Sequence, residues 1–279
     1  MMPTHAATSD SPDLLKDVVR SHWDAQPCGT LGVPASDRRA FFEQVERERY
    51  EWEPYIRDFA RFERGRDKKL LEVGVGAGTD FTNWVRNGAI ATGVDLTEHG
   101  VALTRERLEL EGLKADVRVA DAENLPFETN TFDLVYSHGV LHHSPDTPRA
   151  IREVHRVLRP GGTALVMIYN VHSWVGFMLW SVHALGRLKP WKSPRWAIYN
   201  YLESPGTKAY SIAEGYELFR DFTRVAIRTH LGHGDLLLMR RSAKYQDKLH
   251  ELAWRLYPRW LVRQLGHRFG MNMFIEAVK

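Results

Sequence analysis

The sequence predicts an α/β protein in which helices flank a mostly parallel β-sheet. Between Lys69 and Tyr169, short apolar runs alternate with stretches of helical spacing, and turn residues separate them. A glycine-rich turn follows the first apolar run, and Pro160-Gly161-Gly162 follows the last helical stretch, which we expect to end there. Alternation of this kind builds parallel β-α units with right-handed crossovers.

Length and composition limit the class of protein. The chain has 279 residues, of which 43% are apolar and 26% are charged, as in ordinary globular proteins. Its one cysteine, Cys28, excludes a disulfide framework and a cysteine-rich metal centre. The amino-terminal residues lack the apolar run of a secretory signal, and the longest apolar stretch, Trp174 to Leu185, is too short to span a bilayer. These features predict a soluble, cytoplasmic protein.

The expected elements follow one another along the whole chain. We expect helices over Leu14–Trp23, Asp37–Phe62, Thr79–Arg86, Gly100–Glu111 and Thr147–Leu158. We expect strands over Leu70–Val73, Ala91–Val94, Val117–Ala120, Phe132–Tyr136, Thr163–Tyr169, Val225–His230 and Met273–Lys279. Residues 171–218 are expected to form helices and loops. Residues 244–265 carry an amphipathic pattern that Pro258 should interrupt, with Leu249, Leu252, Ala253, Leu256 and Trp260 on one face.

Charge divides the chain after Asn170. Residues 171–279 hold 17 Lys and Arg against 8 Asp and Glu, a net charge of +9, so the first part carries −6 of the total of +3. Six of the nine tryptophans also lie in the second part. We interpret residues 1–65 as a helical arm or lid, 66–170 as the core, and 171–279 as substrate-side helical additions plus the last two strands of the same sheet.

The glycine-rich turn is the first candidate binding element. Leu70 to Asp80 forms a strand, turns on Gly74, Gly76 and Gly78, and enters a helix. Glycine allows a tight turn and close approach of the backbone to a ligand. The spacing differs from the dinucleotide fingerprint, which would place its third glycine or alanine at Thr79, and no Gly-Lys-Ser/Thr of a P-loop follows.

Two acidic residues follow the next strands. Asp95 ends the second strand, where a carboxylate can accept both hydroxyls of a ribose. Asp121 follows the third strand, where it could accept from an exocyclic adenine amine while a neighbouring backbone N–H binds a ring nitrogen. Each acid could instead cap a helix or turn. Together the three elements indicate a nucleoside at the carboxyl edge of the sheet.

At these residues the sequence resembles the class I S-adenosylmethionine-dependent methyltransferases. The blocks that carry the resemblance lie between about residues 66 and 170 and read LEVGVGAGTD, GVDLT, ADAENLPF, FDLVYSHGVLHHSPD and EVHRVLRPGG. The last two resemble the group that includes ubiquinone and menaquinone methyltransferases and many natural-product enzymes. The resemblance implies a Rossmann-like seven-stranded sheet whose last strand is antiparallel, helices on both faces, and helical additions that cap the substrate.

The resemblance also implies a cofactor site. S-adenosylmethionine would be the methyl donor and S-adenosylhomocysteine the product. Glu72 and the three glycines would line the methionine end, with Ser137 close by. Asp95 would hold the ribose and Leu96 would lie against the adenine. Asp121 and Ala122 would recognise the adenine edge.

Methyl transfer to oxygen or nitrogen often needs a base, and the first candidate is His138 at the end of the fourth strand. His138 could instead only shape the pocket. His142 and His143 follow on the same loop, where His143 is a second catalytic candidate, although such a pair is also a feature of this group's fold. Tyr169 could orient a substrate hydroxyl or form the pocket wall. No carboxylate clusters with the histidines, so we expect no metal.

The acceptor stays open at this stage. We expect O-, N- or C-methylation of a small organic metabolite. Ser137-His138-Gly139 departs from the motif of enzymes that methylate base amino groups, which argues against nucleic acid as a partner. The basic, Trp-rich second part keeps peripheral membrane contact open, with a lipid or quinone as the acceptor. A module that binds the cofactor without catalysis is the alternative of another class. The sequence does not define the oligomeric state.

Overall fold

The computed structural model describes residues 12–25, 27, 30, 37–202, 206–238, 255 and 257–279. Its centre is a seven-stranded sheet with the order β3-β2-β1-β4-β5-β7-β6. The strands are β1 (Lys69–Val73), β2 (Ile90–Asp95), β3 (Asp116–Val119), β4 (Phe132–His138), β5 (Leu158–Tyr169), β6 (Arg224–His230) and β7 (Asn272–Val278). The first five strands pair in parallel, and β7 inserts antiparallel between β5 and β6. The predicted sheet is confirmed.

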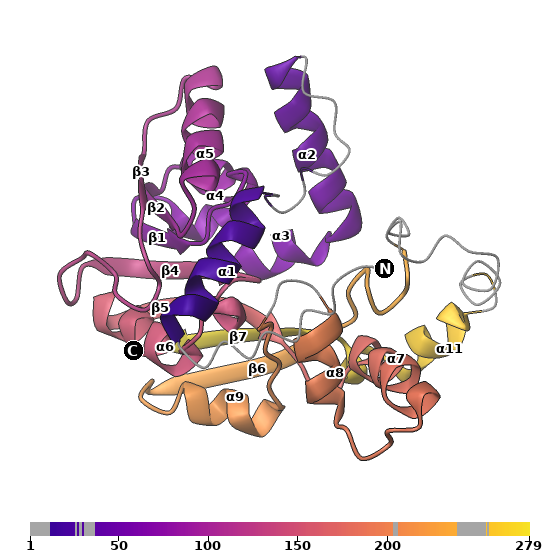
Figure 1. The fold of residues 1–279 in the computed structure, drawn as a ribbon. Helices are drawn as coiled ribbons and strands as arrows, with labels where there is room; N and C mark the ends of the chain where they lie inside the picture. The colour runs from indigo at the N-terminus through magenta and orange to yellow at the C-terminus, as the bar shows by residue number, and fades with distance from the viewer. Residues whose placement is uncertain are drawn as a thin grey trace.

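Helices cover both faces of the sheet (Figure 1). On one side lie α6 (Thr147–Val157) and α9 (Ile212–Leu218), and on the other lie α2 (Arg38–Trp52), α4 (Thr79–Arg86) and α5 (Glu98–Leu110). Two large buried clusters correspond to these faces. One joins Ile151 and Val154 of α6 to the sheet, and the other joins Phe81 and Trp84 of α4 to it. Burial of these two apolar faces against the sheet stabilises the layers.

The amino-terminal helical region differs from the prediction of one helix over Asp37–Phe62. The segment divides into α2, a short helix α3 (Tyr55–Ala60) and a 3₁₀ turn over Phe62–Gly65. The break lies at Glu53 and Pro54, because proline has no N–H to continue the helical hydrogen bonds. The break places Glu53 beside the cavity described below.

A second difference concerns Pro160-Gly161-Gly162, which was expected to end a helix. Helix α6 already ends at Val157, and β5 begins at Leu158. The Pro-Gly-Gly segment therefore lies within the first part of this long strand, where the pairing with β4 shifts register between Phe132 and Leu134. Such irregularities suit proline and glycine, which disrupt a regular ladder.

The remaining helices lie around the carboxyl end of β5 and over the sheet edge. They are α1 (Pro12–Ala25), α7 (Trp174–His183), α8 (Pro194–Tyr201) and α11 (Arg259–Leu265). Helix α11 begins directly after Pro258, as the interrupted pattern predicted, whereas Leu249, Leu252, Ala253 and Leu256 lie outside the described residues. So does Cys28. No helix in the described part of the chain is long and apolar enough to cross a membrane.

Candidate active site

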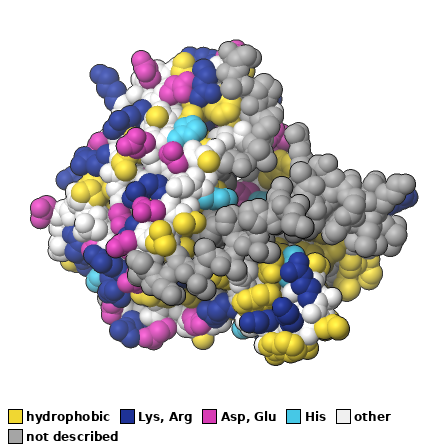
Figure 2. Space-filling model, viewed as in Figure 1, with side chains coloured by type: hydrophobic (Ala, Val, Ile, Leu, Met, Phe, Trp, Pro, Cys, Tyr) yellow, Lys and Arg dark blue, Asp and Glu magenta, His cyan; other side chains and the backbone are white. Residues whose placement is uncertain are grey.

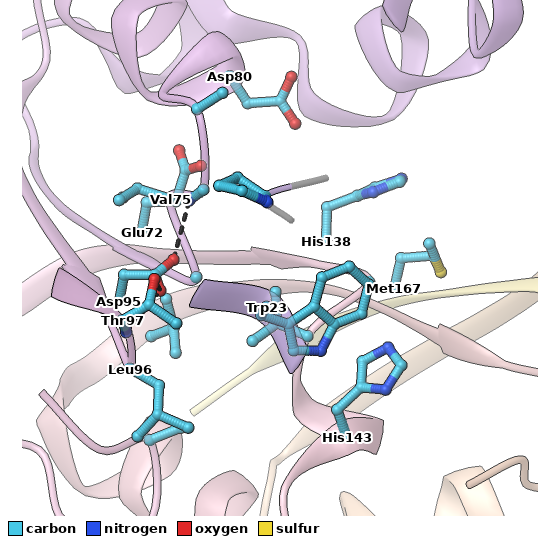
Figure 3. A pocket seen from close by; sticks show the side chains of 18 of the residues that line it. Trp23, Glu72, Val75, Asp80, Asp95, Leu96, Thr97, His138, His143 and Met167 are labelled. Atoms are coloured by element: carbon cyan, nitrogen blue, oxygen red, sulfur yellow. Dashed lines mark hydrogen bonds between the residues drawn. The ribbon is translucent and has the colours of Figure 1, made fainter. Parts of the chain in front are cut away.

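A cavity of about 400 Å³ opens at the carboxyl ends of the central strands. The turns after β1, β2, β3 and β4 contribute to its wall, and side chains of α1 and α2 line it too. Figure 3 labels ten of the lining side chains. Ten of the predicted site residues line it: Glu72, Gly74, Gly76, Asp95, Leu96, Asp121, Ala122, His138, His143 and Tyr169. The edge of a parallel sheet where strands end is the usual ligand site of such folds.

The glycine turn is fixed by its own backbone geometry. Gly74 and Gly76 have φ angles of +86° and +53°, in the left-handed region that favours glycine. A Cβ atom at Gly74 would lie 2.2 Å from Val140 Cγ2, whereas one at Gly76 would meet nothing within 4 Å. Gly74 is therefore required by packing, and Gly76 leaves free space at the cavity wall.

Asp95 joins the glycine turn to the helix that follows β2. Its Oδ2 accepts a hydrogen bond from Gly76 N at 2.9 Å, and its Oδ1 accepts from Thr97 N and Thr97 Oγ1 at 2.9 and 2.7 Å. Thr97 in turn caps α5 by accepting from Gly100 N. A carboxylate oxygen accepts two hydrogen bonds, so Oδ2 retains capacity for a ligand hydroxyl.

Asp121 has a partner that the sequence did not indicate. Lys16 of α1 lies with its Nζ 2.7 Å from Asp121 Oδ2 and 2.7 Å from Glu123 Oε2. Lys16 and Trp23 of the same helix line the cavity, and the Trp23 ring packs edge-on against His143 at 5.2 Å. Helix α1 thus covers the cavity over the predicted adenine position, where the carboxylate is already paired.

Glu72 provides the test of whether this cavity fits the implied cofactor. Its side chain is buried, and its Oε2 has no hydrogen-bond partner among the described residues. Burial, reinforced by Asp80 and Asp95, raises the pKa of Glu72 well above its ordinary value. An unpaired buried carboxyl oxygen is costly unless a ligand satisfies it. The ammonium group of a bound amino acid moiety would do so, and S-adenosylmethionine carries one, so the residues fit this group.

Two predicted cofactor residues do not line the cavity. The Ser137 hydroxyl is buried and donates to Val73 O at 2.9 Å, which joins β4 to β1. Gly78 packs against Thr104 of α5, where a Cβ atom would lie 2.9 Å from the Thr104 hydroxyl. In this structure both residues support the cavity wall from behind.

His138 lies at the end of β4 and lines the cavity beside Met167 (Figure 3). Its Nε2 is shielded from solvent and has no hydrogen-bond partner among the described residues. Burial, with a smaller contribution from Arg49, lowers the pKa of His138 to about 4, although Glu53 and Asp80 act in the opposite direction. The imidazole is therefore neutral at pH 7 and able to accept a proton.

Sequence reasoning missed a charged group on the opposite wall. Arg49 pairs with Asp80 at 3.0 Å (Nε to Oδ1), and the Tyr136 hydroxyl donates to the same carboxylate at 2.8 Å. Glu53 accepts from the Tyr55 hydroxyl at 2.8 Å and lies 3.8 Å from His233 Nδ1. Arg49 is 31 residues from Asp80 in sequence and follows no motif, so only the fold brings these two residues together.

The remaining histidines differ in position. His143 lines the cavity, and burial lowers its pKa to about 3. His142 is buried behind it and packs on Tyr169, with ring centroids 4.0 Å apart and ring planes tilted by 41°. Tyr169 therefore reaches the cavity at the end of β5 while one side of its ring packs on His142. This contact favours a wall role for His142.

Comparison with known proteins identifies the class of this fold. Residues 71–166 match the family described as methyltransferase domain. The phthiotriol/phenolphthiotriol dimycocerosates methyltransferase of Mycobacterium leprae is 44% identical over 97 residues, which is 34% of this chain and 35% of that protein. The chloroplastic 2-methyl-6-phytyl-1,4-hydroquinone methyltransferase 2 of Oryza sativa subsp. japonica is 40% identical over 109 residues, 38% of this chain and 30% of that protein. The matched segment thus spans about a third of each relative.

Solved structures show the same fold over most of the chain. One chain of the Haloferax volcanii complex that contains the Trm112 methyltransferase activator aligns with a TM-score of 0.59 and 19% identity, covering 93% of this chain and 96% of that chain. The [4+2]-cyclase SpnF aligns with a TM-score of 0.54 and 19% identity, covering 100% and 97%. Because SpnF is a cyclase, the fold alone does not define the reaction.

The sheet order, the glycine turn and the family match all indicate the same class of fold. The fold is that of the class I methyltransferases. Residues 71–166 match a methyltransferase domain, which implies S-adenosylmethionine as the methyl donor.

Proposed function

We propose that this protein transfers the methyl group of S-adenosylmethionine to a hydroxyl oxygen of a small, largely apolar organic molecule. The observation that supports an oxygen acceptor is the neutral, unpaired Nε2 of His138 at the cavity wall. A hydroxyl must lose its proton as it attacks carbon, so it gains most from such a base. Aromatic and aliphatic side chains that line the same cavity, among them Trp52, Val140 and Met167, suit an apolar substrate.

Different residues of the cavity would bind the cofactor, accept the proton and exclude water. Glu72 and Asp95 would hold the amino acid and ribose ends of the cofactor, and Leu96, Ala122 and Asp121 would surround the adenine. Bound S-adenosylmethionine would supply an electrophilic methyl group on its sulfonium, and the thioether S-adenosylhomocysteine would be the product. His138 Nε2 accepts the hydroxyl proton. Trp23 and His143 of the cavity wall exclude water, and Tyr169 orients the substrate from the end of β5.

A second candidate is the methylation of a lipid or quinone at a membrane surface. The names of the Mycobacterium leprae and Oryza sativa relatives support it, since they are a dimycocerosates methyltransferase and a phytyl-hydroquinone methyltransferase. This candidate shares the catalytic residues and changes only the source of the acceptor. A module that binds the cofactor and transfers no methyl group is the alternative of another class.

The test is a transfer assay with methyl-labelled S-adenosylmethionine, a cell extract and a separate lipid fraction, followed by mass spectrometry of the labelled product. We predict a labelled O-methyl ether. His138→Ala should lower turnover by about 10²- to 10⁴-fold and leave the affinity for S-adenosylhomocysteine unchanged. The base is inactive once protonated, so kcat/KM should fall only as the pH drops through about 4 rather than 6.5.

Three results would count against this function. Unchanged turnover in His138→Ala would remove His138 as the base. A labelled nitrogen or carbon would remove the oxygen acceptor. Binding of S-adenosylhomocysteine without transfer to any fraction would favour the non-catalytic module.

A further inference from the structure

Helix α7 has a composition that does not match its position. Seven of the ten residues in WVGFMLWSVH are large and apolar, yet only Val175, Gly176 and His183 are buried. A helix that is apolar on all sides is expected in a protein core or in contact with a membrane. This helix instead lies on the surface, packed against α8 at the lower right of the molecule (Figure 1).

The exposed apolar side chains continue beyond the helix. We call the following set the α7–α8 patch: Phe177, Val182, Leu185, Leu188, Trp191 and Tyr199, all of them exposed. Leu188 and Trp191 are the extreme cases, with 84% and 73% of their surface accessible. Figure 2 shows hydrophobic side chains gathered over this part of the molecule. Single exposed apolar residues are common, but a contiguous set marks an interaction surface.

The segment that carries the patch is basic. Residues 174–202 contain Arg187, Lys189, Lys192 and Arg195 and no Asp or Glu, and Arg195 forms an ion pair with Glu214 of α9 at 2.7 Å. Between the two helices, residues 185–191 are all exposed, and Arg187 and Lys189 flank Leu188 there. Aromatic and aliphatic side chains mixed with Lys and Arg are typical of segments that lie in a bilayer interface. The same basic residues are attracted by anionic headgroups.

The connection between the helices holds one residue in a strained conformation. Leu188 has a φ angle of +56°, in the left-handed region that favours glycine. Its side chain extends into solvent, so it stabilises no core. A glycine at this position would relieve the backbone strain and remove the exposed apolar side chain. Leu188→Gly can therefore weaken surface binding without lowering the stability of the fold.

A single turn connects the patch to the candidate active site. His233 lines the cavity, and Asp235, two residues later, accepts hydrogen bonds from Gly232 N and Met271 N at 2.9 and 2.8 Å. The same carboxylate accepts from Val175 N, in the first turn of α7, at 3.4 Å. The first turn of α7, the helix that carries Phe177 and Val182 of the patch, is therefore hydrogen-bonded to the turn that lines the cavity.

We infer that the α7–α8 patch docks on the surface of a bilayer that contains anionic lipid. The apolar side chains insert among the headgroups, and Arg187, Lys189 and Lys192 pair with lipid phosphates. The patch residues lie outside the cavity, so vesicle binding can be measured without methyl transfer. The test of docking is therefore independent of the test of the proposed function.

The experiment is co-sedimentation of the purified full chain with vesicles of phosphatidylcholine that contain about one third phosphatidylglycerol. We expect binding at low salt, weaker binding at high salt, and weaker binding to vesicles of phosphatidylcholine alone. Leu188→Gly combined with Trp191→Ser should lower the partition coefficient by about tenfold or more without loss of thermal stability. Lys189→Glu combined with Lys192→Glu should also lower it by about tenfold or more.

Matched controls lie on or next to β1, β2 and β3, which are separate in the sheet order from the strands nearest α7 and α8. Ile90 and Val119 are exposed apolar residues, and Lys68 and Lys114 are exposed cations. Ile90→Ser with Val119→Ser, and Lys68→Glu with Lys114→Glu, should bind vesicles as the wild type does. The inference is overturned if wild type does not bind anionic vesicles at low salt, or if patch and control variants bind equally. It is also overturned if the patch instead forms a dimer, seen as a change of mass in solution that the Leu188→Gly, Trp191→Ser variant abolishes.

Discussion

At the scale of single residues, the site depends on polar atoms that the protein leaves unsatisfied. Glu72 Oε2 and His138 Nε2 are both buried at the cavity wall without a hydrogen-bond partner in the described part of the chain. Native proteins pair nearly all buried polar groups, so two orphans on one cavity indicate a ligand that completes them. The glycine motif and the end of β4 predicted both positions from sequence. Their lack of partners became evident only in three dimensions.

Glu72 gives a prediction about pH. Because burial, Asp80 and Asp95 raise its pKa, the free protein holds this carboxyl in its neutral form at pH values where an ordinary glutamate is ionised. A ligand ammonium favours the carboxylate, so binding releases a proton, and affinity should rise as the pH increases through the raised pKa. Calorimetry with S-adenosylhomocysteine at a series of pH values above the ordinary range of a glutamate pKa measures this rise. In Glu72→Gln the rise should disappear. Parallel pH dependence in wild type and Glu72→Gln would contradict the assignment.

Replacing Gly74 or Gly76 by alanine should have different effects on stability and on ligand binding. Gly74→Ala forces a Cβ atom against Val140 at a left-handed φ, so the free energy of unfolding should fall by more than about 2 kcal/mol. Gly76→Ala has space, so it should cost about 1 kcal/mol of stability and weaken S-adenosylhomocysteine binding by about tenfold instead. Chemical denaturation and calorimetry on both variants separate the effects. Equal loss of stability would contradict the distinction.

At the scale of elements, α1 is the feature that changes the view of the site most. The spacing of Leu14–Trp23 predicted the helix, and residues 1–65 were interpreted as an arm or lid, but the contacts that α1 makes at the cavity were not predicted. The contacts of Lys16 with Asp121 and Glu123 span more than 100 residues and follow no local pattern. The break of α2 before Pro54 is similar. Pro54 explains why the helix ends there. The position of Glu53 at the cavity follows only from the tertiary structure.

The position of α1 predicts a change in release kinetics. Lys16→Met removes both ion pairs and leaves two neighbouring carboxylates unpaired, so the helix should open more readily. We expect S-adenosylhomocysteine to dissociate about fivefold faster, which corresponds to about 1 kcal/mol. Stopped-flow tryptophan fluorescence can follow release, because Trp23 lines the cavity. Arg20→Met on the same helix removes only an exposed pair with Asp17 and should leave the rate unchanged. Equal rates in both variants would exclude α1 as the cover.

At the scale of the whole molecule, periodicity and turn residues predicted all seven strands and most of the helices, because these signals are local. The order of the sheet required the resemblance to the methyltransferases, since pairing of distant strands leaves no local trace. The division of charge after Asn170 indicated that the second part has a different environment. The α7–α8 patch, which is basic and apolar, supplies a physical reason for that division.

The central claim is that the cavity over the glycine turn binds the sulfur nucleoside through Asp95. Calorimetric titration of the full chain with S-adenosylhomocysteine tests it most directly. We predict one-to-one binding in the wild type, a loss of about 1–3 kcal/mol in Asp95→Ala, and unchanged affinity in the exposed control Asp116→Ala. Folded wild-type protein that gives no binding heat, or Asp95→Ala that binds as tightly as wild type, would contradict the claim.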